Sequence, residues 1–236
     1  MEPALLAWHA EHGADLPWRV RRDPYAVLVS EVMLQQTQVA RVVPAFQAWM
    51  ERWPNVEALA AARLEDVIRA WQGLGYNRRA VNLHRATRIV AEHGWPGDLT
   101  ELPGVGSYTA AAIRRFAWGD SVLPLDTNVQ RVIDRTGADF SPAAAEALMD
   151  LGRGVCLARV PRCGICPLAD GCPSRGQRFE PLRKQSRFEG SFRQRRAETL
   201  RLVAAGHTSG LDADALAALE RDGLVETRSG LARLPQ

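Results

Sequence analysis

Four cysteines within a span of seventeen residues limit most strongly what this chain can fold into, because the 236-residue sequence has no others. They follow the spacing C-x6-C-x2-C-x5-C and are Cys156, Cys163, Cys166 and Cys172. Disulfides between them would close loops too short to build a framework for a chain of this length, whereas four thiolates this close in sequence can converge on one soft metal centre. The spacing therefore predicts a metal site.

The arrangement of these cysteines also favours one kind of metal centre. Structural zinc usually takes its ligands as two close pairs separated by a longer gap, while iron–sulfur clusters use a run of four cysteines in one loop. We therefore expect a [4Fe–4S] cluster, with structural zinc or four ordinary buried cysteines as the alternatives. Thiols that stay reduced for a cluster indicate a cytoplasmic protein.

Composition indicates a globular protein with a packed core. Hydrophobic residues make up 46% of the chain, no apolar run approaches the roughly 20 residues that span a bilayer, and no signal peptide is expected. The net charge of +3 permits a polyanionic partner. Because Lys184 is the only lysine, nearly all of the positive charge is carried by arginine.

The hydrophobic pattern is helical through most of the chain, and Gly, Pro, Asp or Asn residues bound the helical segments. Pro44 is expected to kink or divide the longest of them. The helices are expected at residues 2–12, 24–50, 56–61, 64–72, 77–93, 107–117, 127–136, 142–151, 191–204 and 213–222.

Strand signals are nearly absent before residue 220. Residues 173–190 are charged, lack an apolar period and are typical of a linker. The last two helices are followed by a small hairpin with its turn at Ser229 and Gly230. This order predicts an all-α fold with a small winged-helix-like appendage at its C-terminal end.

A second motif, Leu102-Pro103-Gly104-Val105-Gly106, directly precedes the helix expected from Ser107. Proline and two glycines allow a tight turn whose N–H groups point outward at a helix N-terminus, where they can bind a phosphate. A tight turn between two helices with no ligand is the alternative. The candidates for contact with a DNA backbone are Gly104, Val105, Gly106 and Ser107.

Taken together with the cysteine run, these motifs resemble the helix-hairpin-helix DNA glycosylases of the endonuclease III superfamily, most closely the MutY-type adenine glycosylases. The resemblance covers roughly residues 5–175, and SEVMLQQTQV at 30–39 is its most discriminating part. The other segments that carry it are LPWR at 16–19, WQGLGYNRRAVNLH at 71–84, LPGVGSYTAAAI at 102–113, LDTNVQRVIDR at 125–135 and EALMDLG at 146–152.

The resemblance implies two helical lobes on either side of a DNA-binding cleft. The helix-hairpin-helix lobe would span 22–127, and the cluster lobe would combine 1–21 with 128–176. A linker at 177–190 and the appendage at 191–236 would follow. The implied partner is double-stranded DNA with a mismatched or damaged base, bound by a monomer away from any membrane.

Glu31 and Asp126 fit the two roles that cleavage of an N-glycosidic bond requires. One group must make the base a better leaving group, and an anion must stabilise the oxocarbenium-like sugar. Because Glu31 lies among apolar residues, desolvation should raise its pKa and keep it protonated. The resemblance implies that Glu31 protonates adenine and that Asp126 stabilises the sugar. The alternatives are an ordinary helix carboxylate for Glu31 and a helix N-cap for Asp126.

Tyr108 bears on the type of reaction. In the bifunctional members of the superfamily, a lysine at this place forms a Schiff base with the sugar and cleaves the strand. This chain has tyrosine there, and Lys184 lies in the expected linker. We therefore expect a monofunctional glycosylase with little or no lyase activity.

The resemblance also assigns residues that recognise the bases once the target nucleotide is flipped out of the helix. Core packing is the alternative for Trp18 and Leu74, and a helix end for Tyr76. The adenine pocket would be lined by Trp18, Arg19 and Glu146, with Asn128 near the sugar. The partner base would be probed by Gln36, Thr37, Leu74 and Tyr76.

Two departures from the family pattern matter. The segment before EALMDLG is shorter than usual, which puts the placement of Glu146 in doubt. The Nudix-like domain that usually recognises 8-oxoguanine has no counterpart in the residues after the cluster segment. A thymine or uracil mismatch glycosylase and a non-catalytic, DNA-binding or redox-sensing cluster protein therefore remain as alternatives.

Overall fold

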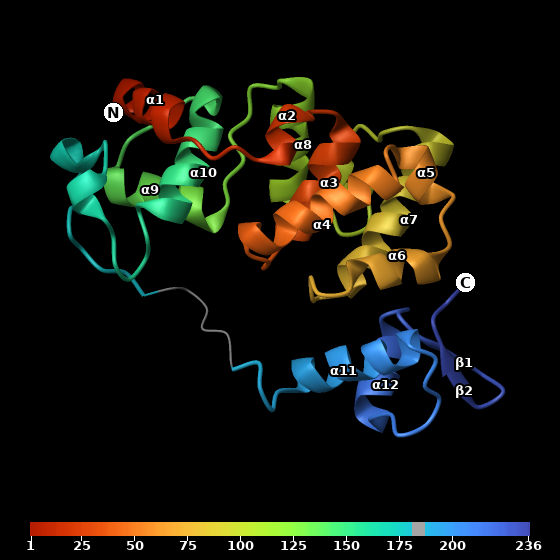
Figure 1. Ribbon diagram of the computed structural model, residues 1–236. Coiled ribbons are helices and arrows are strands. Elements are labelled where there is room, and N and C mark those ends of the chain that lie inside the picture. The colour runs from red at the N-terminus through yellow and green to blue at the C-terminus, as the bar shows by residue number, and fades with distance from the viewer. Residues whose placement is uncertain (181–186) are drawn as a thin grey trace. The chain divides into compact units, whose positions relative to one another are not determined.

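The computed structural model describes residues 1–180 and 187–236 and divides into two compact units (Figure 1). Unit 1 consists of Met1–Pro24 and Ser107–Lys184, and unit 2 of Tyr25–Gly106 and Gln185–Gln236. Each unit is therefore built from two separate stretches of chain. The domain boundaries expected above stay a prediction, and part of the expected linker at 177–190 lies outside the described residues.

Unit 1 is helical. Its helix α9 packs against α10, and α1 packs against α10 (Figure 1). Short 3-10 turns connect these helices and shape the cysteine segment. Buried apolar side chains from all three helices, including Leu5, Val132 and Leu148, form the core. The elements are α1 (Glu2–His12), α2 (Pro17–Val20), α8 (Ser107–Trp118), α9 (Thr127–Thr136), α10 (Ala145–Gly154), η2 (Pro142–Ala144), η3 (Cys163–Ile165) and η4 (Ala169–Gly171).

Unit 2 is built around a helix that is buried on all sides. Every residue from Tyr25 to Met33 of α3 is buried, as expected for a helix that is apolar around its whole circumference. Helices α5 and α6 pack on α7. None of the helices in the described ranges is long and apolar enough to cross a membrane. The elements of the first stretch are α3 (Pro24–Leu34), α4 (Val39–Arg52), α5 (Val56–Ala60), α6 (Leu64–Trp71), α7 (Arg78–His93) and η1 (Leu99–Glu101).

Pro44 does not divide the segment, so that part of the prediction is wrong. The segment 24–50 divides earlier, between α3 and α4, where Gln36 takes a left-handed backbone conformation with φ of 57°. Pro44 lies inside α4 and removes one backbone hydrogen bond from it. Helix α4 still forms because its apolar face buries Val42, Phe46 and Trp49.

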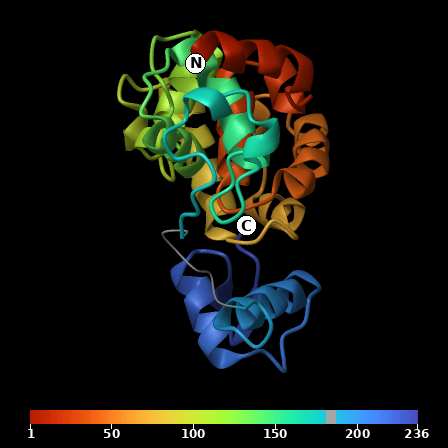
Figure 2. The same ribbon diagram turned by 90° about the vertical axis from the view of Figure 1, so that its left-hand side faces the viewer.

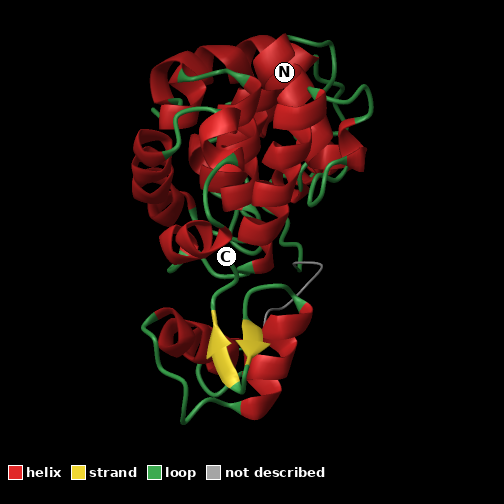
Figure 3. Cartoon of the chain, turned by 90° about the vertical axis from the view of Figure 1, so that its right-hand side faces the viewer, coloured by secondary structure: helices red, strands yellow, loops and turns green. Residues whose placement is uncertain are grey.

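The C-terminal segment forms two helices and a hairpin that pack against one another (Figure 2). These are α11 (Phe192–Ala204), α12 (Ala213–Arg221) and the antiparallel strands β1 (Glu226–Arg228) and β2 (Leu231–Arg233) (Figure 3). Ser229 and Gly230 both have positive φ, 51° and 76°, as a two-residue hairpin turn requires. The all-α fold with a small hairpin-bearing appendage is confirmed.

This appendage shares a hydrophobic core with α6 and α7. Ile68 and Val81 from these helices are buried in one cluster with Leu200, Leu219 and Leu224 of the appendage. At the edge of the cluster, the Arg78 guanidinium lies 3.5 Å from a carboxylate oxygen of Asp222. The appendage is therefore part of the packed interior of unit 2.

His84 makes the stability of unit 2 depend on pH. Its ring is buried in α7, and its Nε2 lies 3.0 Å from the Ala62 carbonyl oxygen. Burial lowers the pKa of His84, and the nearby charges of Arg88 and Arg85 add to this effect, although the bond to Ala62 opposes it. The unfolded chain therefore binds a proton that the folded chain does not.

We expect the free energy of unfolding to fall as the pH drops below about 6.5, the ordinary pKa of histidine. The loss should level off below the lower pKa of folded His84. In His84→Gln, whose amide can still donate to Ala62, this part of the pH dependence should be missing. Urea unfolding at pH 5 to 8 measures it, and identical pH profiles for both proteins would refute the prediction.

Candidate functional site: a cysteine-lined centre tied to Asp126

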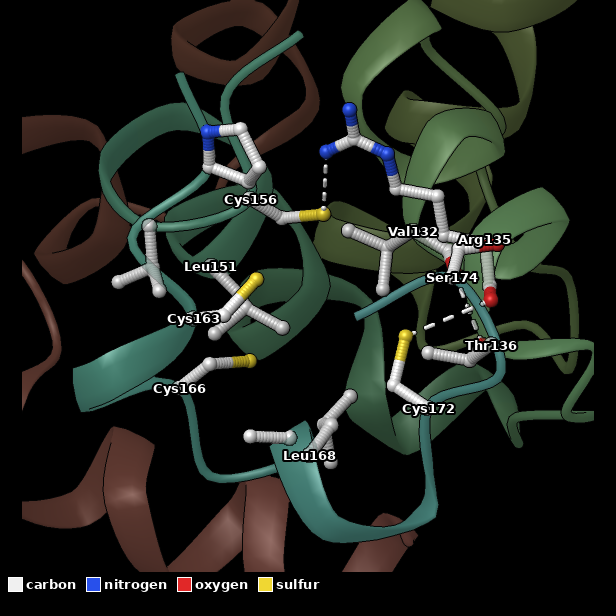
Figure 4. A pocket seen from close by; sticks show the side chains of 13 residues that line it. Val132, Arg135, Thr136, Leu151, Cys156, Cys163, Cys166, Leu168, Cys172 and Ser174 are labelled. Atoms are coloured by element: carbon white, nitrogen blue, oxygen red, sulfur yellow. Dashed lines mark hydrogen bonds between the residues drawn. The ribbon is translucent and has the colours of Figure 1, made fainter. Parts of the chain in front are cut away.

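The four cysteines line one pocket in unit 1, as the sequence predicts. Their sulfur atoms face a common space between η3, η4 and the end of α9 (Figure 4). The rest of the lining is largely apolar, with Val132, Leu151, Val155 and Leu168 among it. Four half-buried thiols around an apolar pocket suit a soft metal centre shielded from water.

Hydrogen bonds to the cysteines come from groups that suit thiolate ligands. The buried guanidinium of Arg135 donates to Cys156 Sγ at 3.2 Å (Figure 4). The Gly176 backbone N–H donates to Cys163 Sγ at 3.3 Å. Arg135 also stacks on the Phe179 ring, with 4.6 Å between its Cζ and the ring centroid. Such donors stabilise negative charge on sulfur and tune an iron–sulfur centre.

The chemistry of the cysteines also fits a bound cluster. Burial raises the pKa of the Cys166 thiol, and the three neighbouring cysteines raise it further. Four thiolates in this pocket therefore need a cationic centre to compensate their charge. Within residues 1–180 and 187–236, no group of three or more His, Cys, Asp or Glu side chains is placed to hold a metal ion. The pocket holds all four cysteines, as a cluster with several irons requires.

Asp126 begins α9 as its N-cap, which confirms the alternative noted for it. Its Oδ1 accepts hydrogen bonds from the backbone N–H groups of Asn128 at 2.8 Å and Val129 at 2.6 Å. Its Oδ2 accepts from Asn128 Nδ2 at 3.0 Å. This capping fixes the carboxylate in one orientation, and a fixed carboxylate can still stabilise a cation.

A chain of hydrogen bonds connects Asp126 to the cysteine segment. The Asn128 side chain, which donates to Asp126, accepts from Arg131 Nη2 at 2.8 Å. Arg131 in turn donates from Nε to the Cys156 carbonyl at 2.7 Å and from Nη2 to the Gly152 carbonyl at 2.7 Å. The position of the Asp126 carboxylate therefore depends on the segment that carries the first cysteine.

Helices α9 and α10 meet at Gly152 with no room for a side chain. A Cβ atom on Gly152 would lie 2.8 Å from Asn128 Cβ and 2.9 Å from the Asn128 carbonyl oxygen. Real Cβ atoms do not approach other atoms this closely, so only glycine allows α10 to lie against the first turn of α9. Gly152 thus helps to set where Asn128 and Asp126 lie.

Two of the three residues expected in the base pocket lie close together in unit 1. Arg19 Nε is 3.7 Å from Glu146 Oε1, and Arg22 Nη2 donates to both Glu146 oxygens at 3.0 and 3.2 Å. Arg19 also forms a two-pronged ion pair with Asp150, at 2.7 and 3.1 Å. Trp18 is buried in α2 next to Arg19. Their role in binding a base stays a prediction.

Asp150 is a buried anion that the sequence did not single out. Burial would raise the pKa of its carboxyl, but hydrogen bonds from Arg19 and the Ala14 N–H, with the charges of Arg19 and Arg153, hold that pKa below its usual value. The Ala14 N–H lies 2.9 Å from Asp150 Oδ2. Asp150 therefore anchors the N-terminal stretch of the chain to α10.

Glu31 is buried in α3, with 7% of its surface exposed. The alternative of an ordinary exposed helix carboxylate is therefore wrong. The neighbouring residues Val29, Val32 and Met33 are buried as well, which is the apolar setting that the sequence predicted. Glu31 belongs to unit 2 and Asp126 to unit 1, and the expectation that they act on one nucleotide stays a prediction.

The residues expected to probe the partner base lie in two turns of unit 2. Gln36 and Tyr76 are exposed and both have positive φ, 57° and 47°. Leu74 is buried, and the Thr37 hydroxyl donates to the Leu74 carbonyl at 3.2 Å. Arg79 bonds to both turns, and its sequence context does not predict this, because an arginine inside a helix gives no sign of its burial.

The helix-hairpin-helix turn follows η1 and leads into α8. Gly104 has φ of +81°, and a Cβ there would lie 3.0 Å from Asn82 Cβ, so this turn needs glycine. Val105 is buried and donates its N–H to the Leu102 carbonyl, while Gly106 and Ser107 are exposed. Tyr108 lies half-buried in the first turn of α8. Contact of this turn with DNA stays a prediction.

Comparison with protein families finds two matches that together cover most of the helices and the cysteine segment. Residues 29–152 match the HhH-GPD superfamily base excision DNA repair protein, and residues 156–172 match the iron-sulfur binding domain of endonuclease III. The second match includes all four cysteines. The cofactor expected from their spacing, a [4Fe–4S] cluster, is confirmed at the level of the family.

Comparison with individual proteins gives consistent results. The adenine DNA glycosylase of Mycolicibacterium smegmatis is 42% identical over 83% of this chain and 78% of its own length. The human adenine DNA glycosylase is 40% identical over 75% of this chain and 39% of its own length. Among solved structures, a thermostable thymine-DNA glycosylase aligns with a TM-score of 0.66 at 25% identity, covering 73% of this chain and 93% of that one. A non-covalent endonuclease III–DNA complex aligns with a TM-score of 0.62 at 23% identity, covering 73% and 92%, and shows the shared fold.

Proposed function

The chain belongs to the HhH-GPD superfamily of base excision DNA repair proteins, and from its similarity to adenine DNA glycosylases we propose that it releases adenine from mismatched DNA. It is a base-excision DNA glycosylase with an iron–sulfur binding domain. One observation carries the finer proposal. Asp126 is a fixed carboxylate, tied through Asn128 and Arg131 to the cysteine segment, in a chain similar to adenine glycosylases over most of its length.

In the proposed reaction, the target adenosine is flipped out of the duplex so that its glycosidic bond becomes accessible. Glu31 donates a proton to the departing purine while the bond between C1′ and N9 breaks and its electron pair stays on the base. The Asp126 carboxylate stabilises the positive charge that develops on the sugar. Water then adds to C1′ and returns a proton to Glu31, which leaves an abasic site.

The residues around the cysteines act as a scaffold in this proposal. A bound cluster cross-links the segment from Cys156 to Cys172, which restricts the motion of that loop. Arg131 transmits the loop's position to Asn128, and Asn128 holds Asp126. Trp18, Arg19 and Glu146 would bind the flipped base, and Gln36, Thr37, Leu74 and Tyr76 would lie beside a partner guanine or 8-oxoguanine.

The test is a panel of four labelled duplexes that contain A:8-oxoguanine, A:G, T:G or U:G. Abasic sites are detected by strand cleavage in alkali, under single-turnover conditions. We expect release of adenine from the first two duplexes, and Glu31→Gln should abolish it. The structural likeness to a thymine-DNA glycosylase makes the pyrimidine duplexes necessary. Release from T:G or U:G alone would favour the pyrimidine alternative, and no release from any duplex would favour a binding protein.

We also propose that the reaction stops at the abasic site. A lyase needs an amine to form a Schiff base, and the second residue of α8 is Tyr108, which carries none. Strand breaks should therefore appear only after alkali, and borohydride should trap little protein on the DNA. The matched variant Tyr108→Lys should increase trapping. High trapping yields with the unchanged protein would contradict a monofunctional mechanism.

A further inference from the structure

Arg79 is a buried cation whose hydrogen-bond acceptors are almost all backbone carbonyls. Only 8% of its surface is exposed, and its guanidinium lies 5.2 Å from the Trp71 ring centroid. Burial lowers its pKa to about 10, so that it remains charged at neutral pH. The acceptors are the carbonyls of Val32 at 2.7 Å, Met33 at 3.0 Å, Gln35 at 2.7 Å, Leu74 at 3.2 Å, Gly75 at 2.8 Å and Tyr76 at 3.3 Å, and the Thr37 hydroxyl at 3.0 Å.

Two of these acceptors, Val32 and Met33, lie in the last turn of α3, and the others belong to two turns that are far apart in the sequence. We call residues 35–37 and 73–77 the paired turns. The first turn follows the end of α3. The bonds from Arg79 to Val32 and Met33 satisfy two of the last carbonyls of that helix. The second joins α6 to α7. One guanidinium, helped by the bond from the Thr37 hydroxyl to the Leu74 carbonyl, therefore fixes both turns to each other.

The backbone of the paired turns is strained. Gln36 and Tyr76 adopt left-handed conformations that cost a residue other than glycine about 1 kcal/mol or more each. Capping of α3 alone does not explain this strain. A glycine at position 36 or 76 would adopt the same backbone conformation without it. Strained residues persist only where their surroundings over-determine them. In the paired turns, the bonds to Arg79 supply that constraint.

Among the residues of the paired turns that carry a side chain, the two strained ones are also the exposed ones. Gln36 is exposed, and Tyr76 has 39% of its surface exposed while Leu74 beside it is buried. A glutamine amide can donate to and accept from a base edge, and a tyrosine ring can stack on a base. A buried cation that holds these two side chains at fixed places has the features of a preformed recognition surface.

We propose that Arg79 is a positioning residue that joins the paired turns into one rigid surface, so that Gln36 and Tyr76 distinguish a mismatched duplex from a paired one. The proposal about Arg79 rests on the proposed function, because it assumes that the paired turns recognise the DNA beside the target base. Arg79 itself does not touch DNA in this account. It acts by preventing the two turns from moving independently.

Lysine cannot replace Arg79 in this role. Its ammonium group is a single point of charge with three donors, whereas the planar guanidinium reaches acceptors on both turns at once. The Arg79→Lys variant therefore keeps the charge and loses the bridge. Thr37→Val is a milder second variant, which removes only the hydroxyl between the turns. Arg78→Lys is the matched control, because Arg78 is the adjacent residue on α7 and is exposed. Its one ion pair within the described residues is with Asp222.

Two measurements test the proposal on the intact, cluster-loaded protein. The first is hydrogen exchange of the free protein at the amides of Thr37 and Leu74, which bond to the Leu34 and Trp71 carbonyls. We expect Arg79→Lys to speed exchange by about tenfold or more, because the turns open locally while the rest of the unit stays folded. Thr37→Val should show a smaller increase, and Arg78→Lys none.

The second measurement is the ratio of dissociation constants for a fully paired duplex and one containing A:8-oxoguanine. Arg79→Lys should reduce this ratio by about tenfold, because fixed geometry supplies the discrimination. A purely structural role would lower the fraction of active protein and leave the ratio unchanged. The proposal would be overturned if Arg79→Lys left either the ratio of dissociation constants or the amide exchange unchanged. If Arg79→Lys does not fold, either of these outcomes in Thr37→Val would overturn it. If the unchanged protein neither discriminates nor releases adenine, the proposed function itself is wrong.

Discussion

Asp126→Asn will reduce adenine release by about 10²- to 10⁴-fold, the range that a positioned catalytic charge contributes. The asparagine oxygen can still accept the N–H groups of Asn128 and Val129 that now bond to Asp126 Oδ1. Helix α9 therefore keeps its cap, and the variant loses the negative charge that would stabilise the sugar cation. Single-turnover assays on an A:8-oxoguanine duplex measure the loss.

Two further variants separate the charge from the cap. Asp126→Ser keeps a capping oxygen without a charge, and Asp126→Ala removes both, which costs about 1 kcal/mol of stability. All three variants should lose activity, but only Asp126→Ala should melt at a clearly lower temperature. If Asp126→Asn retained more than a tenth of the rate, the role of Asp126 as an anion would be excluded.

Gly152→Ala will reduce the activity that depends on Asp126, although Gly152 lies in α10 and Asp126 caps α9. The new Cβ would lie within 3.0 Å of three Asn128 atoms, two of them backbone atoms, so α9 and α10 must move apart. Overpacking of this kind costs about 1 to 3 kcal/mol. The movement also displaces Asn128, which bonds to Asp126, and Arg131, which bonds to the Gly152 carbonyl. We expect the rate of adenine release to fall by about 10²-fold, as positional errors in catalytic groups produce.

Gly154→Ala is the matched control for this substitution. Gly154 lies in the same helix, and a Cβ there would meet no atom within 4 Å. Alanine at this position should leave activity unchanged and raise stability slightly, because alanine favours helix more than glycine does. Thermal unfolding and single-turnover rates are measured on both variants. Equal rates for Gly152→Ala and Gly154→Ala would show that the contact between the helices does not position Asp126.

The sequence predicted well those features that depend on neighbouring residues. The helix from Thr127 to Thr136 has the expected bounds because an acidic cap begins it and a left-handed Gly137 ends it. The turn at Ser229 and Gly230 was identifiable for the same reason. The cysteines were found by their spacing, since metal ligands from one loop remain close in sequence.

The sequence could not predict interactions between distant parts of the chain. Asp150 binds Arg19 across 131 residues, and Arg79 binds Val32 across 47. Nothing in the local pattern distinguishes such an arginine from one on a solvated helix face. The failure at Pro44 has a related cause, because the packing of the α4 face outweighed the local preference of proline.

The anchoring of the N-terminal stretch to α10 has a consequence for synthesis on the ribosome. Ala14 and Arg19 emerge early, but their partner Asp150 is added 136 and 131 residues later. At about 5 to 20 residues per second, that interval lasts several seconds or longer, during which α1 and α2 lack the surface they pack on. The nascent chain must therefore keep its first helices exposed until α10 and the cysteine loop have emerged. Insertion of a cluster and closure of unit 1 would then follow as late, coupled events.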